Sequence, residues 1–510
     1  LTRTFALVFG IWVGLAAPAT VPAAQPLALP DLGQTPDPVA PKASPLDLPD
    51  FGSSADTVMS SSQERRLGRA FMQSVRKALP VSSDPLLTDY VTNLGNDLVS
   101  AGGTGAGNYS FFLIDEPVIN AFAGPGGYVG IYAGLILAAQ SEGELAAVMA
   151  HEIAHVTQRH LMRSFEDQGK LTIPTLALLV AAAVLGAKVS GDVAAAAVTG
   201  IQAAALQHQI NFTRDNEKEA DRIGIVTLAK AGHDPYAMAG FFERLSKDSR
   251  TKENNAPEFL RTHPVNTNRI ADAVARAEAH GHRQRPDTLR FHLTRADLRQ
   301  RSFRRADQAV ESFRKTIREG RFANETAEHY GLALALERQG DLEGAQKEAA
   351  ALRAKLPQQA ETVVLEARLQ RRRGDLAGAL ANLREAIGLA PTSWPLNMAY
   401  AEALTEAGRS ADALKAMRVV APQRPNDPQL YKLMADAAGK SGEKGEIHLY
   451  RAEALYLAGD LEPAIKQLEI GLRTPGLTYQ AGSRLQVRLE ELRDEYRDLK
   501  KAGEPVSNKR

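Results

Sequence analysis

Apolar and polar positions in the first part of the chain follow helical periods that a short strand-like segment interrupts. Apolar residues recur every three or four positions after Ser61 and again over Asp84–Val99, which predicts two amphipathic helices. Residues 109–115 and 128–132 are short runs rich in aromatic and β-branched side chains, which predicts two strands. A glycine pair between them predicts a tight turn. We therefore expect a small sheet among helices.

Further helical patterns follow the second strand. Residues 142–163 form a third predicted helix, with Ser141 as its N-cap and Glu144 completing a capping box. Helical spacing returns in the highly charged segment 214–224 and again over Asn268–Glu278. The first 285 residues therefore predict a mostly helical domain that contains a small sheet.

The second half of the chain is periodic. Glycines recur every 34 residues, at Gly340, Gly374, Gly408 and Gly442. Prolines recur with the same period at Pro357, Pro391 and Pro425, and small alanine side chains suited to a helix contact recur at Ala345 and Ala379. This period predicts tetratricopeptide repeats, in which two helices alternate with a glycine turn and a proline-containing turn. The first helix pair, Leu293–Glu319, is degenerate. A Gly-Asp-Leu triplet returns out of phase at Gly459, which suggests a break in the superhelix and a pocket there.

Two apolar regions raise the question of a membrane. Phe5–Ala17 follows Arg3 and precedes small residues, which predicts a signal peptide over residues 1–23. An uncleaved anchor is the alternative, but thirteen apolar residues are short for a bilayer span. Residues 24–58 are a proline-rich linker. The apolar region 171–206 predicts a helical hairpin near the site described below, which could contact a membrane or a partner, and true membrane spans are the alternative.

Composition excludes several classes of function. The formal net charge is only +1, so the chain lacks the large overall positive charge that would attract nucleic acid. The chain has no cysteine, which excludes cysteine-ligated zinc, thiol catalysis and disulfides. Residues 283–321 hold 12 basic and 5 acidic side chains but no aromatic platform for RNA. We interpret them as a solvated face of the first repeats, with contact to anionic lipid as the alternative.

The strongest chemical signal is the pentad His151-Glu152-Ile153-Ala154-His155 on the third predicted helix. A helix turns by about 100° per residue, so the two histidines share one face and can hold two corners of a tetrahedral Zn²⁺. Glu152 is displaced by one residue, where its carboxylate can reach a metal-bound water without ligating the metal. The pentad therefore predicts one zinc ion per chain, with Glu152 as general base.

A catalytic zinc needs a third protein ligand. The metzincin pattern is excluded, because Gln158 and Leu161 stand where it requires glycine and a third histidine. Glu217 and Asp221 are spaced i, i+4 on the charged helix. Glu217 suits the third ligand, and Asp221 suits a carboxylate that receives an N–H from a ligand histidine. Glu219 lies between them and is expected to face elsewhere.

Together these motifs resemble family forty-eight of the metallopeptidases, which includes the HtpX heat-shock proteases and the CaaX prenyl proteases. The resemblance covers roughly residues 60–285 and rests also on Asn120–Gly127 and on Thr262-His263-Pro264. It implies a zinc endopeptidase whose ligands match His151, His155 and Glu217. Exported members lack the transmembrane helices of HtpX, and in them the residue that matches His263 is associated with gating.

The remaining candidates are weaker. His263 precedes a helix and is either a gating fourth ligand, a partner of the tetrahedral intermediate, or structural. Three other histidines are neither in helical phase with the pentad nor in a sequence context typical of zinc ligands: His160, His208 and His233. We interpret them as surface or packing residues. Arg214 is a candidate to steady Glu217 or the oxyanion.

Substrate binding is expected at a strand. In zinc peptidases an edge strand beside the metal helix pairs with the extended substrate backbone. We assign this role to residues 128–132, with Tyr128, Val129 and Gly130 as substrate-binding residues.

The sequence thus predicts an α+β zincin-like peptidase domain at residues 59–285, an all-α tetratricopeptide solenoid at residues 290–497, and a tail at residues 498–510. This arrangement resembles the exported, repeat-bearing proteases of the Gram-negative periplasm. The resemblance implies polypeptide substrates such as outer-membrane barrel precursors, with the barrel-assembly machinery as partner. The alternative is a chaperone or assembly scaffold with a structural or silenced zinc. A mitochondrial relative is disfavoured, because the leader holds one arginine and is not an arginine-rich presequence.

Overall fold

The computed structural model describes residues 61–103, 109–163, 176, 180, 214–251 and 257–501, all within one compact unit, Ser54–Arg510. The predicted signal peptide and linker lie outside these residues, as does the apolar region 171–206 apart from Leu176 and Val180, which are buried. Among the described helices, none combines the length and the apolar character that a membrane crossing requires.

Two helices open the described chain. Helix α2 spans Ser61–Ala78 and helix α3 spans Pro85–Gly102. Asp84 caps α3 by accepting from the backbone N–H groups of Leu86 and Leu87, and Gly103 ends it in the left-handed conformation. The predicted amphipathic patterns are therefore confirmed as helices.

The sheet has three strands: β1 (Ser110–Ile114), β2 (Ala121–Gly124) and β3 (Tyr128–Tyr132), with the 3-10 turn η1 (Pro125–Gly127) between β2 and β3. Their order is β1-β3-β2, with β3 parallel to β1 and antiparallel to β2. Alternate side chains enter two cores, so Leu113 packs toward α3 and α5 whereas Phe112 packs toward α2. Strand β2 was not predicted.

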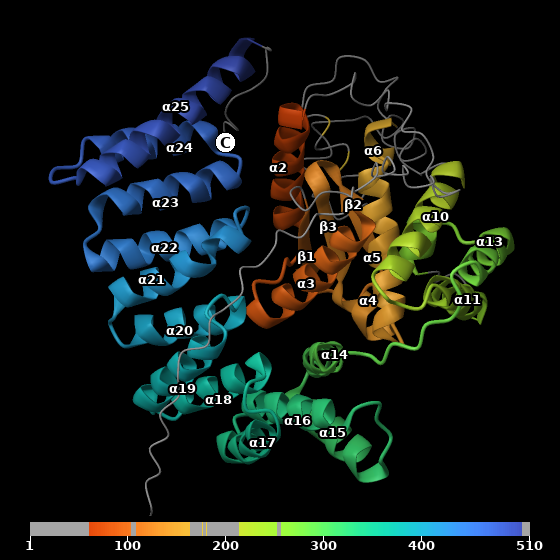
Figure 1. The fold of residues 1–510 in the computed structure, drawn as a ribbon. Coiled ribbons are helices and arrows are strands. Elements are labelled where there is room, and N and C mark those ends of the chain that lie inside the picture. The colour runs from red at the N-terminus through yellow and green to blue at the C-terminus, as the bar shows by residue number, and fades with distance from the viewer. Residues whose placement is uncertain are drawn as a thin grey trace, which may run out of the picture. The chain divides into compact units, whose positions relative to one another are not determined.

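Among the described residues, seven further helices follow the strands in this part of the chain (Figure 1). They are α4 (Ala133–Ala138), α5 (Glu142–Thr157), α6 (His160–Arg163), α10 (Arg214–Lys230), α11 (Tyr236–Thr251), α12 (Glu258–Thr262) and α13 (Thr267–Glu278). Ser141 caps α5 by accepting from the Glu144 N–H at 3.2 Å, as predicted. The prediction of one helix over residues 142–163 is wrong, because α5 stops at Thr157 and Arg159 takes a left-handed φ of 50°.

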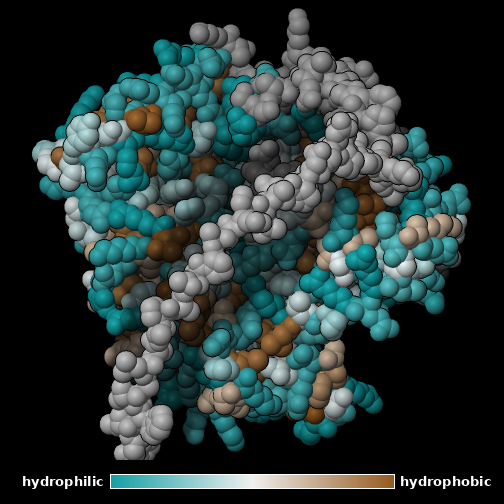
Figure 2. All heavy atoms as spheres, viewed as in Figure 1, coloured by the Kyte–Doolittle hydropathy of each residue, from teal (hydrophilic) through white to brown (hydrophobic). Residues whose placement is uncertain are grey.

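Paired helices build the second half of the chain (Figure 1), and the predicted fold class is confirmed. Their bounds are α14 (Leu289–Ser302), α15 (Ala306–Glu319), α16 (Glu325–Gln339), α17 (Leu342–Lys355), α18 (Ala360–Arg372), α19 (Leu376–Leu389), α20 (Trp394–Glu406), α21 (Ser410–Val420), η4 (Ala421–Gln423), α22 (Pro428–Ser441), α23 (Lys444–Leu457), α24 (Leu461–Leu472) and α25 (Tyr479–Lys501). The side of these helices seen in Figure 2 is mostly hydrophilic, with separate hydrophobic patches.

The repeated Gly-Asp-Leu triplet has a local cause. Gly374 takes a φ of +84°, which a residue with a Cβ adopts only at a cost. Asp375 then caps α19 by accepting from the Gly378 N–H, and Ala379 is fully buried against the neighbouring helix. The same turn occurs at Gly340, where φ is +92°. One turn chemistry thus sets the helix pair in both repeats.

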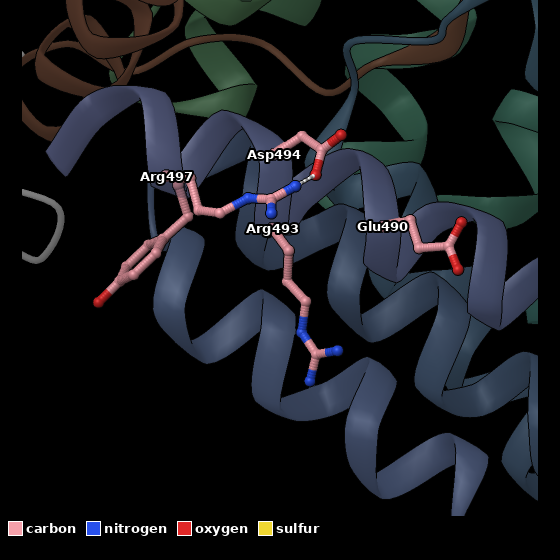
Figure 3. A pocket seen from close by; sticks show the side chains of 5 residues that line it. Glu490, Arg493, Asp494 and Arg497 are labelled. Atoms are coloured by element: carbon pink, nitrogen blue, oxygen red, sulfur yellow. Dashed lines mark hydrogen bonds and ion pairs between the residues drawn. The ribbon is translucent and has the colours of Figure 1, made fainter. Parts of the chain in front are cut away.

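Helix α2 packs against the out-of-phase turn. Gln73 of α2 packs against Gly459, so closely that a Cβ there would lie 2.8 Å from the Gln73 side-chain oxygen. A hollow farther along the chain is lined by α25 alone, where Arg497 pairs with Asp494 (Figure 3). Its charges are satisfied locally, and it contributes nothing to the site described next.

Several arginines of the basic segment 283–321 form ion pairs. Arg299 donates two hydrogen bonds to Glu328, and Arg290 lies 2.9 Å from Asp89 and 3.1 Å from Glu361. Arg301 contacts Asp297 at 2.7 Å. Part of the excess positive charge therefore neutralises neighbouring carboxylates within the fold.

Candidate metal centre

Helix α5 presents the pentad to the interior. His151 and His155 lie one turn apart with side chains exposed by 0% and 2%, and their Nε2 atoms are 3.0 Å apart. Nearly every residue of α5 is buried, so the two imidazoles cannot turn toward solvent. Two ring nitrogens are thereby held facing one point.

Helix α10 brings a carboxylate to the same point. Glu217 Oε2 lies 3.5 Å from His151 Nε2, and Glu217 Oε1 lies 3.3 Å from His155 Nε2. The close approach depends on Gly224, which follows Glu217 two turns later on the same face. A Cβ at Gly224 would lie only 3.2 Å from the backbone nitrogen of His151. The glycine therefore lets α10 lie against α5 at the depth that the carboxylate needs.

His263, which ends α12, supplies a fourth nitrogen. Its Nδ1 lies 3.0 Å from Glu217 Oε1 and 3.3 Å from His151 Nε2. The four side chains form the group of potential metal ligands found among the described residues, and all four are buried. Ligands bonded to a tetrahedral zinc at 2.0–2.1 Å are about 3.3 Å apart, which matches these separations. Three imidazoles and a carboxylate thus form a metal-binding cluster suited to such an ion.

The electrostatics also suit a cation. Burial alone would raise the pKa of Glu217, but the charge of His263 and hydrogen bonds from the imidazoles hold it well below its usual range. Burial would lower the pKa of His151, yet hydrogen bonding with Asp221 and Glu217 raises it to about 10. Burial lowers the pKa of His155 well below its usual value. The Glu217 carboxylate is therefore ionised, which favours a cation, and a metal ion that entered would displace the proton that the raised pKa gives His151.

Glu152 lies beside the cluster without belonging to it. Its carboxylate is fully buried, and Oε1 lies 3.4 Å from His263 Nε2. Neither oxygen makes a hydrogen bond of normal geometry to any residue that the structure describes. Burial raises the pKa of Glu152, although the nearby backbone N–H of Ala123 in β2 and the imidazoles oppose this. A buried carboxylate with a raised pKa beside a potential metal site is a candidate for proton transfer.

Asp221 and Arg269 support the cluster from behind. Asp221 Oδ1 lies 3.0 Å from His151 Nδ1, the ring nitrogen that faces away from the other donors. Arg269 of α13 donates to both Asp221 oxygens at 2.7 and 2.8 Å and lies 2.8 Å from Glu217 Oε2. It also donates to the Pro264 carbonyl, beside His263. Arg269 thus ties both carboxylates to the loop that carries His263.

Arg269 was not predicted from the sequence, and Arg214 was proposed as the partner of Glu217 instead. Arg214 is exposed at the start of α10, whereas Arg269 makes the contact with Glu217 that was expected of Arg214. The position of Arg269, six residues after His263, was visible in the sequence. Nothing local indicated that its side chain would turn back toward α10.

The expectation that His160 is a surface or packing residue, and not a zinc ligand, misses its contact with a member of the cluster. His160 is fully buried, and its Nδ1 lies 2.9 Å from Nδ1 of His155. Its Nε2 lies 3.1 Å from Glu219 Oε2. His233 is buried away from the cluster, near Arg285, and His208 lies outside the described residues.

The expected substrate strand needs a correction. Tyr128, Val129 and Gly130 belong to β3, which is the central strand and pairs on both sides. Its backbone groups are therefore occupied by β1 and β2, and it cannot accept a further strand. In the part of the sheet that the structure describes, the strand at the edge next to Glu152 is β2.

Comparison with known proteins agrees with this geometry. The model of peptidase family M48 matches residues 85–277, and a tetratricopeptide repeat model matches residues 370–437. The chain is 35% identical to the putative beta-barrel assembly-enhancing protease of Vibrio cholerae, over 94% of this chain and 95% of that protein. It is 32% identical to the beta-barrel assembly-enhancing protease of Escherichia coli, over 98% and 97%.

A mitochondrial relative matches over a smaller part. The human mitochondrial metalloendopeptidase OMA1 is 29% identical, over 32% of this chain and 31% of that protein. The bacterial matches instead extend over the peptidase and the repeats together, which confirms the resemblance inferred from the motifs. The chain therefore belongs to peptidase family M48, in the group of the bacterial beta-barrel assembly-enhancing proteases, and is a metalloendopeptidase.

Proposed function

We propose that this chain is a zinc-dependent endopeptidase of the periplasm that acts in outer-membrane protein assembly and degrades misfolded or stalled barrel precursors. The observation that carries the enzymatic part is the buried cluster of His151, His155, Glu217 and His263 beside the buried carboxylate of Glu152. The names of the full-length relatives support the role in barrel assembly. The signal-like leader supports export.

Zinc is the ion that the donor set favours. Imidazole and carboxylate ligands at tetrahedral separations suit Zn²⁺, and a soft cysteine ligand is absent from the sequence. His151, His155 and Glu217 would hold the ion. When bound, zinc supplies a Lewis acid that polarises the scissile carbonyl and lowers the pKa of a water ligand.

The protein's own groups carry the proton. The Glu152 carboxylate accepts a proton from the attacking water and returns it to the leaving amine as the peptide bond breaks. Its burial favours this role, because a raised pKa brings a carboxylate nearer to the pH at which it exchanges a proton. Asp221 accepts the N–H of His151 and so leaves Nε2 of that ring free for the metal.

The substrate is positioned along β2. This strand lies against α5, and the backbone of Ala123 adjoins Glu152. An extended peptide added to β2 would bring its scissile bond next to the cluster, since strand addition aligns main chains by backbone hydrogen bonds. The repeat helices would bind the rest of the substrate or a partner protein.

His263 favours a second state of the same protein. Its Nδ1 lies 3.0 Å from Glu217 Oε1 and 3.3 Å from His151 Nε2, and would take the position at the ion that water and substrate need. With His263 in place the enzyme is latent and acts as a chaperone or assembly scaffold. Displacement of His263 opens the site for proteolysis.

The test is a Glu152→Gln variant, assayed on an unfolded barrel protein and on casein. Loss of the base should lower cleavage by about a hundredfold or more while zinc binding is retained. Glu243→Gln, an exposed substitution of the same type in α11, should cleave normally. Full cleavage by Glu152→Gln would sink the proposed mechanism. Full support of barrel assembly by that variant would instead favour the scaffold role.

A further inference from the structure

A second pair of buried polar side chains stands behind His155. The ring nitrogen of His155 that faces away from the donor cluster, Nδ1, lies 2.9 Å from Nδ1 of His160. The other ring nitrogen of His160 lies 3.1 Å from Glu219 Oε2, and Arg163 Nη1 lies 3.3 Å from the same oxygen. The series His155–His160–Glu219 runs from the interior to a carboxylate whose side chain is 28% exposed.

The backbone is bent to make this contact. In a continued α5, His160 would follow His155 by five residues, about 140° away from its face. The left-handed φ of 50° at Arg159 ends the helix and turns His160 back. A residue with a Cβ adopts this conformation only at a cost. Arg159 is anchored by Glu64, whose Oε2 accepts from it at 3.0 Å.

Hydrogen-bond chemistry assigns the protons along the series. A histidine that offers Nε2 to a metal carries its proton on Nδ1, and so needs an acceptor there. His160 can accept at Nδ1 only when its own proton is on Nε2. Glu219 accepts that proton and so selects this form of His160. Asp221 serves His151 directly, at 3.0 Å, in the same way.

We propose that His160 and Glu219 are positioning residues that fix the tautomer and ring orientation of His155, and thereby strengthen zinc binding. The inference rests on the proposed function, because it requires that His155 ligates zinc. A histidine that only filled space would not need a donor facing one ring nitrogen and a carboxylate acceptor facing the other. Both contacts are present, on a side chain with 0% exposure.

The experiment measures zinc affinity of the full chain by competition with a chelator, independently of proteolysis. His160→Leu removes the acceptor and should weaken zinc binding by about 10- to 100-fold. His160→Asn keeps an oxygen near the position of Nδ1 and should recover most of that loss. Glu219→Ala should weaken binding to a lesser extent. His233→Leu, at a buried histidine outside the cluster, is the matched control and should bind as the unsubstituted chain does.

The outcomes separate this inference from the proposed function. If the unsubstituted chain binds zinc and His160→Leu binds it equally well, the positioning role is overturned. Equal weakening by His160→Asn and His160→Leu would also overturn it, because only packing would then matter. If the unsubstituted chain binds no zinc, the proposed function itself fails. Circular dichroism of each zinc-free variant checks that it folds. If His160→Leu does not fold, the zinc affinity of Glu219→Ala, which changes a partly exposed side chain, tests the positioning role instead.

Discussion

At the scale of single residues, the structure brings together the three expected metal ligands, and a fourth side chain, His263, lies beside them where water and substrate would have to bind. His263 stacks on Phe259, with ring centroids 4.9 Å apart, and contacts Glu217, His151 and Glu152. One side chain thus blocks the cluster and the proposed base at the same time. This geometry favours a resting state that is held closed from within.

His263→Ala should open the site. Removal of the imidazole frees the fourth corner while the other three ligands remain, so cleavage of casein should rise severalfold. His155→Ala removes a ligand that the account requires and should abolish cleavage. His233→Ala serves as the control. A His263→Ala variant with unchanged or lower cleavage, but with normal zinc content, would contradict the latent state.

The residues that sequence could predict are those linked by local geometry. Helix periodicity alone puts His151 and His155 on one face, and the i, i+4 spacing of Glu217 and Asp221 does the same on α10. Arg269 and His160 were missed because their contacts depend on tertiary structure. His160 in particular is out of phase with the pentad and reaches His155 only through the left-handed turn at Arg159.

At the scale of elements, the repeats depend on their turns. Gly374 adopts positive φ and has open space around it, so backbone conformation rather than crowding selects glycine there. Gly388, near the end of α19, also has open space but lies in the helix. The two positions therefore separate the conformational cost of a side chain from its steric cost.

Gly374→Ala should destabilise the repeats by about 1 kcal/mol, because alanine is strained at positive φ. Gly388→Ala should leave stability unchanged or raise it by up to about 1 kcal/mol, because alanine favours the helix. Urea unfolding followed by tryptophan fluorescence, to which the buried Trp394 of α20 contributes, checks both. Equal effects of the two substitutions would refute the role of the turn.

Strands were less predictable than helices. The patterns of β1 and β3 were recognised, but Ala121–Gly124 is short and carries little β-branched character, so β2 was not. Without β2, β3 was taken for an edge strand, although it is central. Strand order depends on pairing between segments, which the pattern within one segment does not report. By contrast, the repeats could be recognised from the sequence, because each repeat can be compared with the other repeats of the same chain.

At the scale of the molecule, the peptidase core and the repeat cores are distinct hydrophobic clusters that α14 joins. Phe291 and Leu298 of α14 pack into the core around α5, whereas Leu293 and Ala296 pack into the first repeat core. Asp89 of α3 adds ion pairs with Arg290 and with Arg424, at 2.9 and 3.5 Å. The potential metal ligands all lie on or next to helices that pack into the first core, namely α5, α10 and α12.

Metal removal should therefore loosen one part of the chain more than the other. Zinc at a hundred times its dissociation constant would stabilise the folded state by about 2.7 kcal/mol. When a chelator removes the metal, hydrogen exchange should become faster in α5 and α10 and should change little in α18–α21. A uniform change along the chain, or none in α5 and α10, would contradict a localised metal site.

The central claim is that two imidazoles of α5 and a carboxylate of α10 bind one zinc ion. Anomalous X-ray scattering from crystals of the protein, measured on both sides of the zinc absorption edge, tests it most directly. We expect a single peak about 2.0–2.2 Å from His151 Nε2, His155 Nε2 and a Glu217 oxygen. No peak at these atoms in zinc-loaded crystals, or a peak held by other side chains alone, would contradict the account.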